Sequence, residues 1–401
     1  MRSLAAALLL VFLGSAAQAQ DRAAAGRYQA ILGDCEGCHT APTGKPFAGG
    51  LVLQTPFGDM GVPNITQDRS TGIGNWSEAE FRRAIREGVA PGGRRLYPAM
   101  PYPYFARMSD ADLSSLWAYL KTLAPVRHAV EVNRLRFPFD VRTLMTGWDW
   151  LYFKSEAFKP VAGKSAEWNR GAYLVTGPGH CGACHTAKTL LGADRAALLT
   201  GDSLQGWFAP EITGAKPRGV GGWSVNDVVT YLKTGWNAHS VASGPMADVV
   251  ERSTSQMNDG DLQAIAVYLK DQPAADSEQQ NALAANDPAM TAGAQLYRQN
   301  CVGCHGWDGK GEGLIVPPLA GNAALIQTSA ENLIRIVLAG AQSVTTKSTP
   351  TEPSMPSFAW KLDDRQMADL LTYVRNSWGN QAPRIRADSI AKVRAGLRGG
   401  S

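Results

Sequence analysis

Three short stretches decide how this sequence is organised, and each has the pattern Cys-x-x-Cys-His. They read Cys35-Glu36-Gly37-Cys38-His39, Cys181-Gly182-Ala183-Cys184-His185 and Cys301-Val302-Gly303-Cys304-His305. The chain of 401 residues has six cysteines, so these motifs contain all of them. Because the pattern recurs with the same internal spacing, the chain is expected to be built from a repeated unit.

The residues around the motifs repeat as well. A helix-like segment with a tyrosine precedes each motif, and a loop rich in glycine and proline follows it. A second short helix is then predicted to begin at a capping box, in which two side chains three residues apart satisfy each other's backbone amides. The three boxes are Ser77 with Glu80, Ser224 with Asp227, and Thr328 with Glu331.

Each repeat ends in a predicted amphipathic helix, with apolar residues on one face at helical spacing. These helices are expected at residues 110–123, 259–269 and 363–378. Strand-like alternation is scarce, so the fold class is predicted to be mostly α. The three repeats themselves are expected at residues 24–125, 166–272 and 288–382.

The segments outside the repeats differ in character. Residues 126–165 form an aromatic-rich connector. A free linker would not carry so much apolar surface, so this connector is expected to pack against the domains or a partner. Residues 273–287 are polar and rich in alanine, and are predicted to be an exposed linker. Residues 383–401 form a basic C-terminal tail, which is predicted to be solvated.

The N-terminus has the features of a secretory signal peptide. Arg2 precedes the apolar run Leu4–Leu13, and small residues surround Ala19. Cleavage is predicted after Ala19, so that residues 1–19 are removed and the chain is exported to the periplasm. A transmembrane anchor is the alternative, but the apolar run is too short to cross a bilayer.

The motif spacing predicts covalent haem attachment. In a Cys-x-x-Cys-His run on a helix start, both thiols can bond to one haem while the histidine ligates its iron. A thioredoxin-type redox pair would not need the histidine in every copy, and a zinc site would need a further Cys or His nearby. The sequence therefore predicts three covalently bound haem c groups. Their thioether residues would be Cys35, Cys38, Cys181, Cys184, Cys301 and Cys304, and their axial histidines His39, His185 and His305.

A methionine is predicted as the sixth iron ligand in each repeat, because its soft thioether favours ferrous iron. Met100, Met246 and Met355 each lie in a Pro- or Gly-rich loop shortly before the last helix. An extended loop of this kind can lay a side chain across a porphyrin. His239 is the rival ligand in the second repeat, and His180 is expected as a surface or propionate contact. Most methionines fill cores, and this is the expectation for Met108, Met257 and Met367.

The second nitrogen of an axial histidine normally donates to a backbone carbonyl. Pro63, Pro210 and Pro318 follow the motifs in comparable loops, and their carbonyls, or those of a neighbour, are candidate acceptors. The alternative is that these prolines only mark turns. The formal net charge is +4, and haem propionates would offset it, so the charge balance argues against a nucleic-acid partner.

Several longer stretches carry a resemblance to a known family. They include Gly33-Asp34-Cys35 to His39-Thr40-Ala41-Pro42, Leu96-Tyr97-Pro98-Ala99-Met100-Pro101-Tyr102 and Met355-Pro356-Ser357-Phe358-Ala359-Trp360. In these stretches the chain resembles the three-haem cytochrome c subunit of bacterial membrane-associated dehydrogenases, which oxidise gluconate, sorbitol, fructose, alcohols or aldehydes in the periplasm. The resemblance implies three tandem class I cytochrome c domains.

The resemblance also implies a role in electron transfer and no catalytic residue of the chain's own. Such subunits accept electrons from a catalytic subunit that carries flavin, pyrroloquinoline quinone or molybdopterin. They pass the electrons to ubiquinone or a terminal oxidase at the outer face of the inner membrane. Two alternatives remain open, namely a freestanding periplasmic shuttle and a haem enzyme of the peroxidase or thiosulfate-oxidising type.

One departure from the family concerns membrane contact. Several relatives end in a longer hydrophobic or amphipathic tail, whereas residues 387–401 here are short and basic. A weak contact with anionic lipid is the alternative to a solvated tail.

Overall fold

The structure is a computed structural model that describes residues 18, 20–131, 133–274, 281–313, 315–347, 349–351 and 353–398. The chain forms two units, one of residues 1–165 and 172–180 and one of residues 166–171 and 181–401. The predicted signal peptide lies outside the described residues except for Gln18. Residues 275–280 of the predicted linker lie outside them too.

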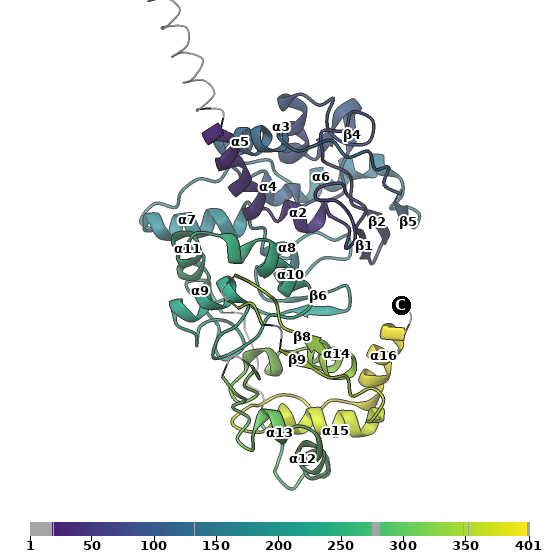
Figure 1. Ribbon diagram of the computed structural model, residues 1–401, viewed down its shortest axis with the longest axis vertical. Coiled ribbons are helices and arrows are strands. Elements are labelled where there is room, and N and C mark those ends of the chain that lie inside the picture. Colours follow the sequence, from purple (N-terminus) through teal and green to yellow (C-terminus); the bar gives the residue numbers. More distant parts are fainter. Residues whose placement is uncertain are drawn as a thin grey trace, which may run out of the picture. The chain divides into compact units, whose positions relative to one another are not determined.

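The first unit consists of helices and short antiparallel strands. It holds the first motif and a sheet in which β2 pairs with both β1 and β5. Figure 1 labels most of these elements. In chain order they are a helix over residues 20–32, α2 (Cys35–Cys38), β1 (Val52–Thr55), β2 (Gly58–Gly61), α3 (Glu78–Glu87), β3 (Val89–Ala90), η1 (Pro91–Gly93), β4 (Arg94–Arg95), α4 (Tyr102–Phe105), α5 (Asp110–Leu120), β5 (Arg134–Leu135), η2 (Arg142–Leu144) and α6 (Met145–Tyr152).

The second unit holds the second and third motifs and is also rich in helices, as the sequence predicts. The helix α7 (Ala166–Thr176) contains residues of both units. The elements that follow are α8 (Gly182–His185), β6 (Asp202–Leu204), β7 (Trp207–Ala209), α9 (Val225–Thr234), α10 (Pro245–Arg252), η3 (Thr254–Gln256), α11 (Asp259–Lys270), α12 (Pro288–Asn300), α13 (Val302–His305), η4 (Ala323–Ile326), α14 (Glu331–Ala339), β8 (Ala341–Gln342), β9 (Ser354–Met355), α15 (Asp364–Val374) and α16 (Ala387–Arg398).

Two of the three predicted capping boxes are confirmed. Ser77 and Glu80 cap α3 reciprocally, and Ser224 and Asp227 do the same for α9. The third prediction is wrong, because α14 begins at Glu331 without a side-chain cap on the preceding residue. The Glu331 amide donates instead to the Ser329 hydroxyl at 3.2 Å. Ser329 is two residues before Glu331, whereas a capping box needs a hydroxyl three residues before it.

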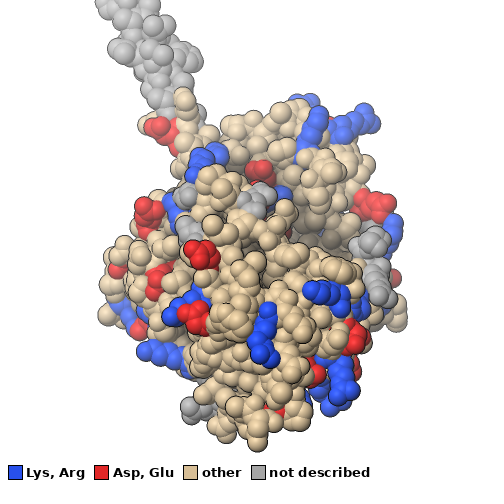
Figure 2. Space-filling view, turned by 60° about the horizontal axis from the view of Figure 1, so that its bottom comes forward, with Lys and Arg blue, Asp and Glu red and all other residues tan. Residues whose placement is uncertain are grey.

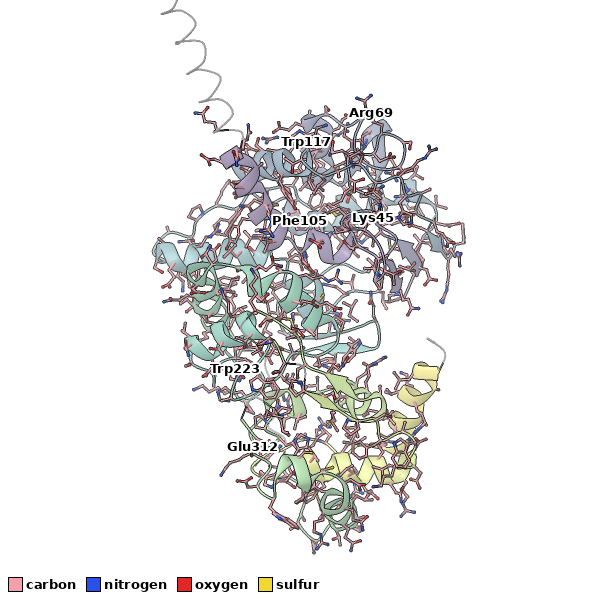
Figure 3. The ribbon with its side chains drawn as sticks, viewed as in Figure 1. Lys45, Arg69, Phe105, Trp117, Trp223 and Glu312 are labelled. Carbon is pink, nitrogen blue, oxygen red and sulfur yellow. The ribbon has the colours of Figure 1, made fainter. Side chains whose placement is uncertain are left out.

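The predicted terminal helices exist as α5, α11 and α15, and they build the cores. The first and third end earlier than predicted, at Leu120 and Val374. In the first unit, Phe105 of α4 and Trp117 of α5 belong to one buried apolar cluster, and Figure 3 labels both. The predicted core methionines are confirmed as buried: Met108 is 2% exposed, Met257 3% and Met367 0%.

A glycine marks the place where each repeat's first helix meets its last helix. At these glycines a side chain would collide with the backbone of the opposite helix, so the axes can approach only where no Cβ is present. A Cβ atom on Gly26 would be 1.8 Å from the Ser115 carbonyl oxygen, one on Gly171 1.9 Å from that of Ala264, and one on Gly293 2.3 Å from that of Asp369.

The aromatic-rich connector packs on the first unit with one side and leaves the other exposed. Asp149 in α6 is buried, whereas Trp150 is 84% exposed and Phe137 81%. The strand β5 joins the sheet of the first unit through the pairs Gly58 with Leu135 and Asp59 with Arg134. The expectation that this segment packs against a domain is therefore confirmed for its inner side.

The prediction of a solvated C-terminal tail is wrong. Residues Ala387–Arg398 form α16, which packs against α14 and α15. Ile390 is fully buried and belongs to the same apolar cluster as α15. Arg394 donates to Asp364 Oδ1 at 2.7 Å and to two main-chain carbonyls. The basic composition predicts a solvated segment, but its apolar residues pack against the core of the second unit.

Charges of both signs are interspersed on the face that Figure 2 shows, and large areas between them carry neither. Within the described part of the chain, no helix combines the length and the apolar character needed to cross a membrane.

Candidate functional site

Each motif forms one short helical turn. The turns are α2, α8 and α13. The first, α2, contains both cysteines of its motif, whereas Cys181 and Cys301 are the N-cap residues of α8 and α13. Residues three apart on a helical turn are neighbours, so the two thiols of each motif are close together. The residue before the first cysteine has a left-handed backbone in two of the motifs, Asp34 with φ 44° and His180 with φ 36°. This backbone reverses the chain between the first helix of the repeat and the motif turn.

The first cysteine of each motif is not placed as a redox thiolate. Five of the six cysteines are half-buried, and Cys304 is exposed. Burial raises the pKa of Cys35 and of Cys181 to about 12, and that of Cys301 to about 11. Reactive thiolates of disulfide oxidoreductases have lowered pKa values instead. The raised values therefore argue against the thioredoxin-type alternative.

The three motif histidines have the same hydrogen-bond geometry. Each Nδ1 atom lies within hydrogen-bond distance of a proline carbonyl oxygen, and because a carbonyl only accepts, Nδ1 carries the hydrogen. The nitrogen left for a metal ion is then Nε2. The distances are 2.7 Å from His39 to Pro63, 2.6 Å from His185 to Pro210, and 3.2 Å from His305 to Pro317.

These bonds bear out the expectation of proline carbonyl acceptors, with the neighbour Pro317 in place of Pro318. Burial lowers the pKa of all three imidazoles, although the proline carbonyls oppose the shift. A lowered pKa keeps the ring neutral near pH 7, and the neutral ring is the form that ligates metal ions.

The structure brings a predicted methionine and a motif cysteine to one core in two of the repeats. Met100 and Cys35 pack against the apolar cluster of the first unit. Met355 and Cys301 pack against the cluster that α15 contributes to in the second unit.

Met246 packs elsewhere, with Val250 and Val344. It lies in the first turn of α10, so the prediction of an extended loop is wrong there: Pro245 occupies the first helical position, where proline favours a helix start. Met355 keeps an extended backbone, since it lies in the short strand β9 and pairs with Ala341.

The other three histidines have different surroundings. His128 Nδ1 lies 2.8 Å from the Ala48 carbonyl oxygen. His239 Nε2 lies 3.4 Å from Asp227 Oδ2, and its ring stacks on Trp223 at 5.4 Å. His180 is half-buried, with Nε2 3.3 Å from the Gly33 carbonyl oxygen and an edge contact to Phe105. The expectation of a surface or propionate contact for His180 stays a prediction. Among the described residues, no three His, Cys, Asp or Glu side chains gather to hold a metal ion.

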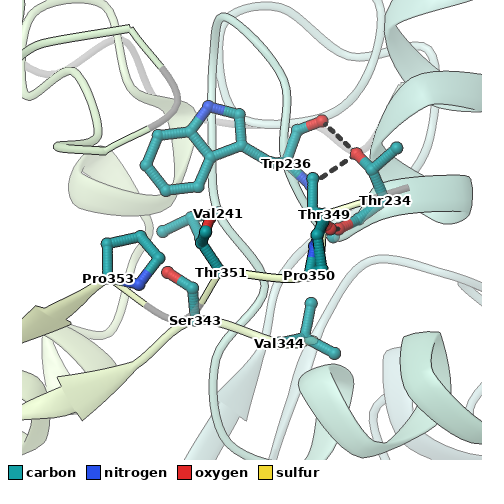
Figure 4. Close-up of a pocket in the computed structure, with 10 residues that line it drawn as sticks. Thr234, Trp236, Val241, Ser343, Val344, Thr349, Pro350, Thr351 and Pro353 are labelled. Carbon is teal, nitrogen blue, oxygen red and sulfur yellow. Dashed lines mark hydrogen bonds between the residues drawn. The ribbon is translucent and has the colours of Figure 1, made fainter. Parts of the chain in front are cut away.

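A cavity of about 120 Å³ lies in the second unit, between the end of α9 and the loop at residues 343–353. Figure 4 shows Trp236 beside it, with the Thr234 hydroxyl bonded to the tryptophan's backbone amide and carbonyl. Val344 lines the cavity and also packs in the cluster that contains Met246. The residues that line it include none of the motif residues, so it is not where a haem would attach.

Comparison with known proteins decides the family. The family described as Cytochrome c matches residues 23–124 and 290–378, which include the first and third motifs. Over 98% of its length the chain is 39% identical to the gluconate 2-dehydrogenase cytochrome c subunit of Pantoea cypripedii, and it covers 94% of that protein. It is also 39% identical to the cytochrome c subunit of alcohol dehydrogenase (quinone) of Gluconobacter oxydans, covering 87% of it.

This chain belongs to the family of dehydrogenase cytochrome c subunits. A further relative, a subunit of the nicotinate dehydrogenase of Pseudomonas putida, is 41% identical over 92% of this chain, which spans only 32% of that longer protein. As a cytochrome c, the chain carries covalently bound haem c, whose iron supplies one-electron redox chemistry.

The described residues fit a c-type haem. Each motif presents two thiols on one turn and a neutral imidazole whose Nδ1 is already bonded to a carbonyl. That bond fixes the tautomer and the orientation of the ring before any metal is bound. Two features are not predicted from the sequence: the helix-crossing glycines, and the hydrogen bonds from Tyr97 and Tyr102, on either side of Met100, to the connector residues Phe139 and Asp149. Both join residues far apart in the chain.

Proposed function

We propose that this cytochrome is an electron-transfer subunit with three covalently attached haem c groups, one in each of three tandem class I cytochrome c domains. The domains are residues 24–125, 166–272 and 288–382. The haems bond to Cys35 and Cys38, Cys181 and Cys184, and Cys301 and Cys304, and their irons are ligated by His39 with Met100, His185 with Met246, and His305 with Met355.

One observation carries the proposal for three haems: all three motif histidines direct Nδ1 at a proline carbonyl oxygen. Such a bond alone does not identify a metal ligand, since His128 Nδ1 also lies 2.8 Å from the Ala48 carbonyl oxygen. Its recurrence at the histidine directly after each Cys-x-x-Cys pair supports an axial role, because the bond fixes the tautomer that leaves Nε2 for the iron. The repeated bond supports a haem at the second motif, which the family match leaves uncovered.

The relatives support a direction of electron flow. The gluconate, alcohol and fructose relatives bear the names of dehydrogenase cytochrome subunits. In our proposal a periplasmic dehydrogenase with flavin, pyrroloquinoline quinone or molybdopterin reduces this cytochrome, which passes the electrons to ubiquinone or an oxidase at the outer face of the inner membrane.

The number of haems can be measured directly. The alkaline pyridine spectrum of the purified protein, divided by the protein concentration, is expected to give three haems per chain. Three double variants, each with both cysteines of one motif changed to alanine, are expected to give two. A wild-type value below three would overturn the assignment of at least one domain.

The electron-transfer role has a separate test. Six-coordinate haems bind carbon monoxide poorly, whereas a haem enzyme needs an open iron. The reduced protein is therefore expected to bind little carbon monoxide, and mixing it with a substrate-reduced dehydrogenase subunit encoded beside it should reduce its haems. Strong carbon monoxide binding by the wild-type protein would favour the haem-enzyme alternative instead.

A further inference from the structure

The aromatic-rich connector holds the loop that carries Met100 from both sides. It contacts Tyr97, three residues before the methionine, and Tyr102, two residues after it. All of these residues belong to the first unit. The contact is therefore indirect, and it reaches Met100 through the two tyrosines.

Tyr102 is fixed by burial and by one strong hydrogen bond. Its side chain is fully buried, and its hydroxyl donates to Asp149 Oδ1 at 2.5 Å. Its ring meets Phe153 of the connector edge-on at 5.0 Å. The ring also lies close to Gly88, where a Cβ atom would be only 2.8 Å from it. Burial, the ring contact and the hydrogen bond together fix the position of Tyr102.

Asp149 is itself held in place. It is 8% exposed, and its second carboxylate oxygen accepts from Arg95 Nη1 at 2.8 Å. A buried carboxylate is stable only where such partners compensate for lost water. The next residue, Trp150, is 84% exposed, so α6 turns its one charged residue inward and an indole outward. Burying charge in place of an apolar ring is costly for folding, which suggests that the buried carboxylate serves another purpose.

Tyr97 is held by the connector in a second place. Its hydroxyl donates to the Phe139 carbonyl oxygen at 2.9 Å. The guanidinium of Arg142 lies 4.4 Å from the centre of its ring, which is a cation–π contact. Arg142 also donates to the Arg95 carbonyl oxygen at 2.7 Å, so it joins both anchor points.

The two anchored tyrosines bond to the backbone of Met100 itself. The Met100 amide donates to the Tyr97 carbonyl oxygen at 3.0 Å, and the Tyr102 amide donates to the Met100 carbonyl oxygen at 2.6 Å. The main chain of Met100 is therefore fixed on both sides by residues whose side chains are gripped by the connector. The other two methionines are held differently, Met246 by a helix start and Met355 by strand pairing.

We propose that Asp149 is a positioning residue for Met100, and that the connector thereby sets the strength of the iron–thioether bond at the first haem. The proposal rests on the proposed function, because it takes Met100 to be the sixth ligand. A thioether favours ferrous iron and raises the reduction potential. Loosening the loop should lower the potential of one haem, expose its iron to added ligands, and leave the other two haems unchanged.

Three variants test the proposal in the full-length holoprotein. Asp149→Ala removes the acceptor for Tyr102, and Tyr102→Phe removes the donor while it keeps the ring that fills the core. Asp149→Asn keeps an acceptor oxygen for Tyr102 but presents an amide NH2 group to Arg95, so it serves as the partial-rescue variant. Trp150→Ala, on the exposed side of the same helix, is the matched control, and Met100→Leu is the reference for complete loss of the ligand.

The readouts are the charge-transfer absorbance of thioether-ligated ferric haem, carbon monoxide binding to the reduced protein, and a redox titration. Met100→Leu is expected to remove about one third of the absorbance, because one of three haems loses its sulfur ligand. Tyr102→Phe and Asp149→Ala should lose part of that third, bind carbon monoxide at one haem, and lower one of three potentials. Asp149→Asn should lie between Asp149→Ala and the wild type, because it keeps the acceptor for Tyr102 and loses the one for Arg95. Trp150→Ala should match the wild type.

Two failures can be told apart. If Met100→Leu leaves the absorbance intact, Met100 is not the ligand, and both the ligand assignment and this inference fall. If Met100→Leu removes the absorbance but Tyr102→Phe and Asp149→Ala lower only the melting temperature, the ligand assignment stands. Asp149 is then merely structural, and the inference is overturned.

Discussion

Gly171 of α7 lies so close to Ala264 of α11 that a Cβ atom on the glycine would stand 1.9 Å from the alanine carbonyl oxygen. The obstacle is a backbone atom, which cannot rotate out of the way as a side chain can. A larger residue would have to push the two helices apart, and a close-packed interior resists such a change. Contacts of this kind, one in each repeat, therefore determine how closely the first and last helices of the repeat approach each other.

Alanine at these crossings is expected to destabilise the protein. Gly26→Ala, Gly171→Ala and Gly293→Ala should each lower the free energy of unfolding by about 1–3 kcal/mol, the usual cost of overpacking. Gly147→Ala is the control, because that helical glycine in α6 has nothing within 4 Å of an added Cβ, and it should be neutral or slightly stabilising. Thermal unfolding followed by circular dichroism measures the difference. Equal melting temperatures for the crossing variants and the control would contradict the role of the crossings.

The sequence alone predicts a structural feature well when the residues that cause it are close together in the chain. The motif turns and the caps at Ser77 and Ser224 depend on residues a few positions apart, and the sequence predicts these correctly. The helix at Met246 is not predicted, although its signal, Pro245 at the first helical position, is also local.

The other features that the sequence does not predict depend on contacts between residues far apart in the chain. Nothing near Gly171 in the sequence reveals that Ala264 lies against it, and nothing near Ile390 reveals the core that buries it. The same holds for Asp149, whose partner Tyr102 precedes it by a whole helix and a strand. A sequence pattern reports the composition of a segment, and the tertiary structure decides which other segment that composition meets.

Arg375 should tolerate no replacement, not even by lysine. It is 2% exposed, and burial lowers its pKa to about 10. Its guanidinium donates to the main-chain carbonyls of Leu325, Gln327 and Pro383 at 2.7, 2.6 and 3.0 Å. A single ammonium cannot reach three separate acceptors. Arg375→Lys is therefore expected to cost about 2–4 kcal/mol of unfolding free energy.

The matched control for Arg375→Lys is Arg386→Lys. The Arg386 side chain is 78% exposed and pairs with the nearby Asp388, so its replacement should change the free energy by less than about 0.5 kcal/mol. Denaturant titration of both variants gives the comparison. A loss of similar size in the two would show that the three carbonyl bonds contribute nothing measurable.

The C-terminal helix should be part of the folded core. Ile390→Ala is expected to cost roughly 2–5 kcal/mol, because the side chain is fully buried against the cluster that includes Leu371 of α15. Lys392→Ala, at an exposed position of the same helix, should be nearly neutral. Limited proteolysis provides a second measurement, since a detached helix is cleaved first. Identical cleavage rates in the two variants would mean that α16 is not held by its buried residue.

Acid stability should depend on Asp68, whose carboxylate accepts hydrogen bonds from the hydroxyls and amides of Ser70 and Thr71. These bonds, that from the Ser70 hydroxyl first, lower its pKa from 3.8 to about 2. Between those values the unfolded chain binds more protons than the folded protein. The carboxylate therefore stabilises the fold above pH 3.8, and this contribution is lost as the pH falls toward 2.

Asp68→Ala should consequently flatten the dependence of stability on pH in this window and leave the dependence above it unchanged. Ser70→Ala removes one hydrogen-bond donor and keeps the charge of Asp68. The slope of stability against pH for this variant should therefore lie between those of Asp68→Ala and the wild type. Denaturant midpoints measured from pH 5 down to about 2 give the slopes, and taking differences from the wild type cancels other acid-labile groups. If all three proteins lose stability in parallel as the pH falls, the hydrogen bonds to Asp68 do not lower its pKa.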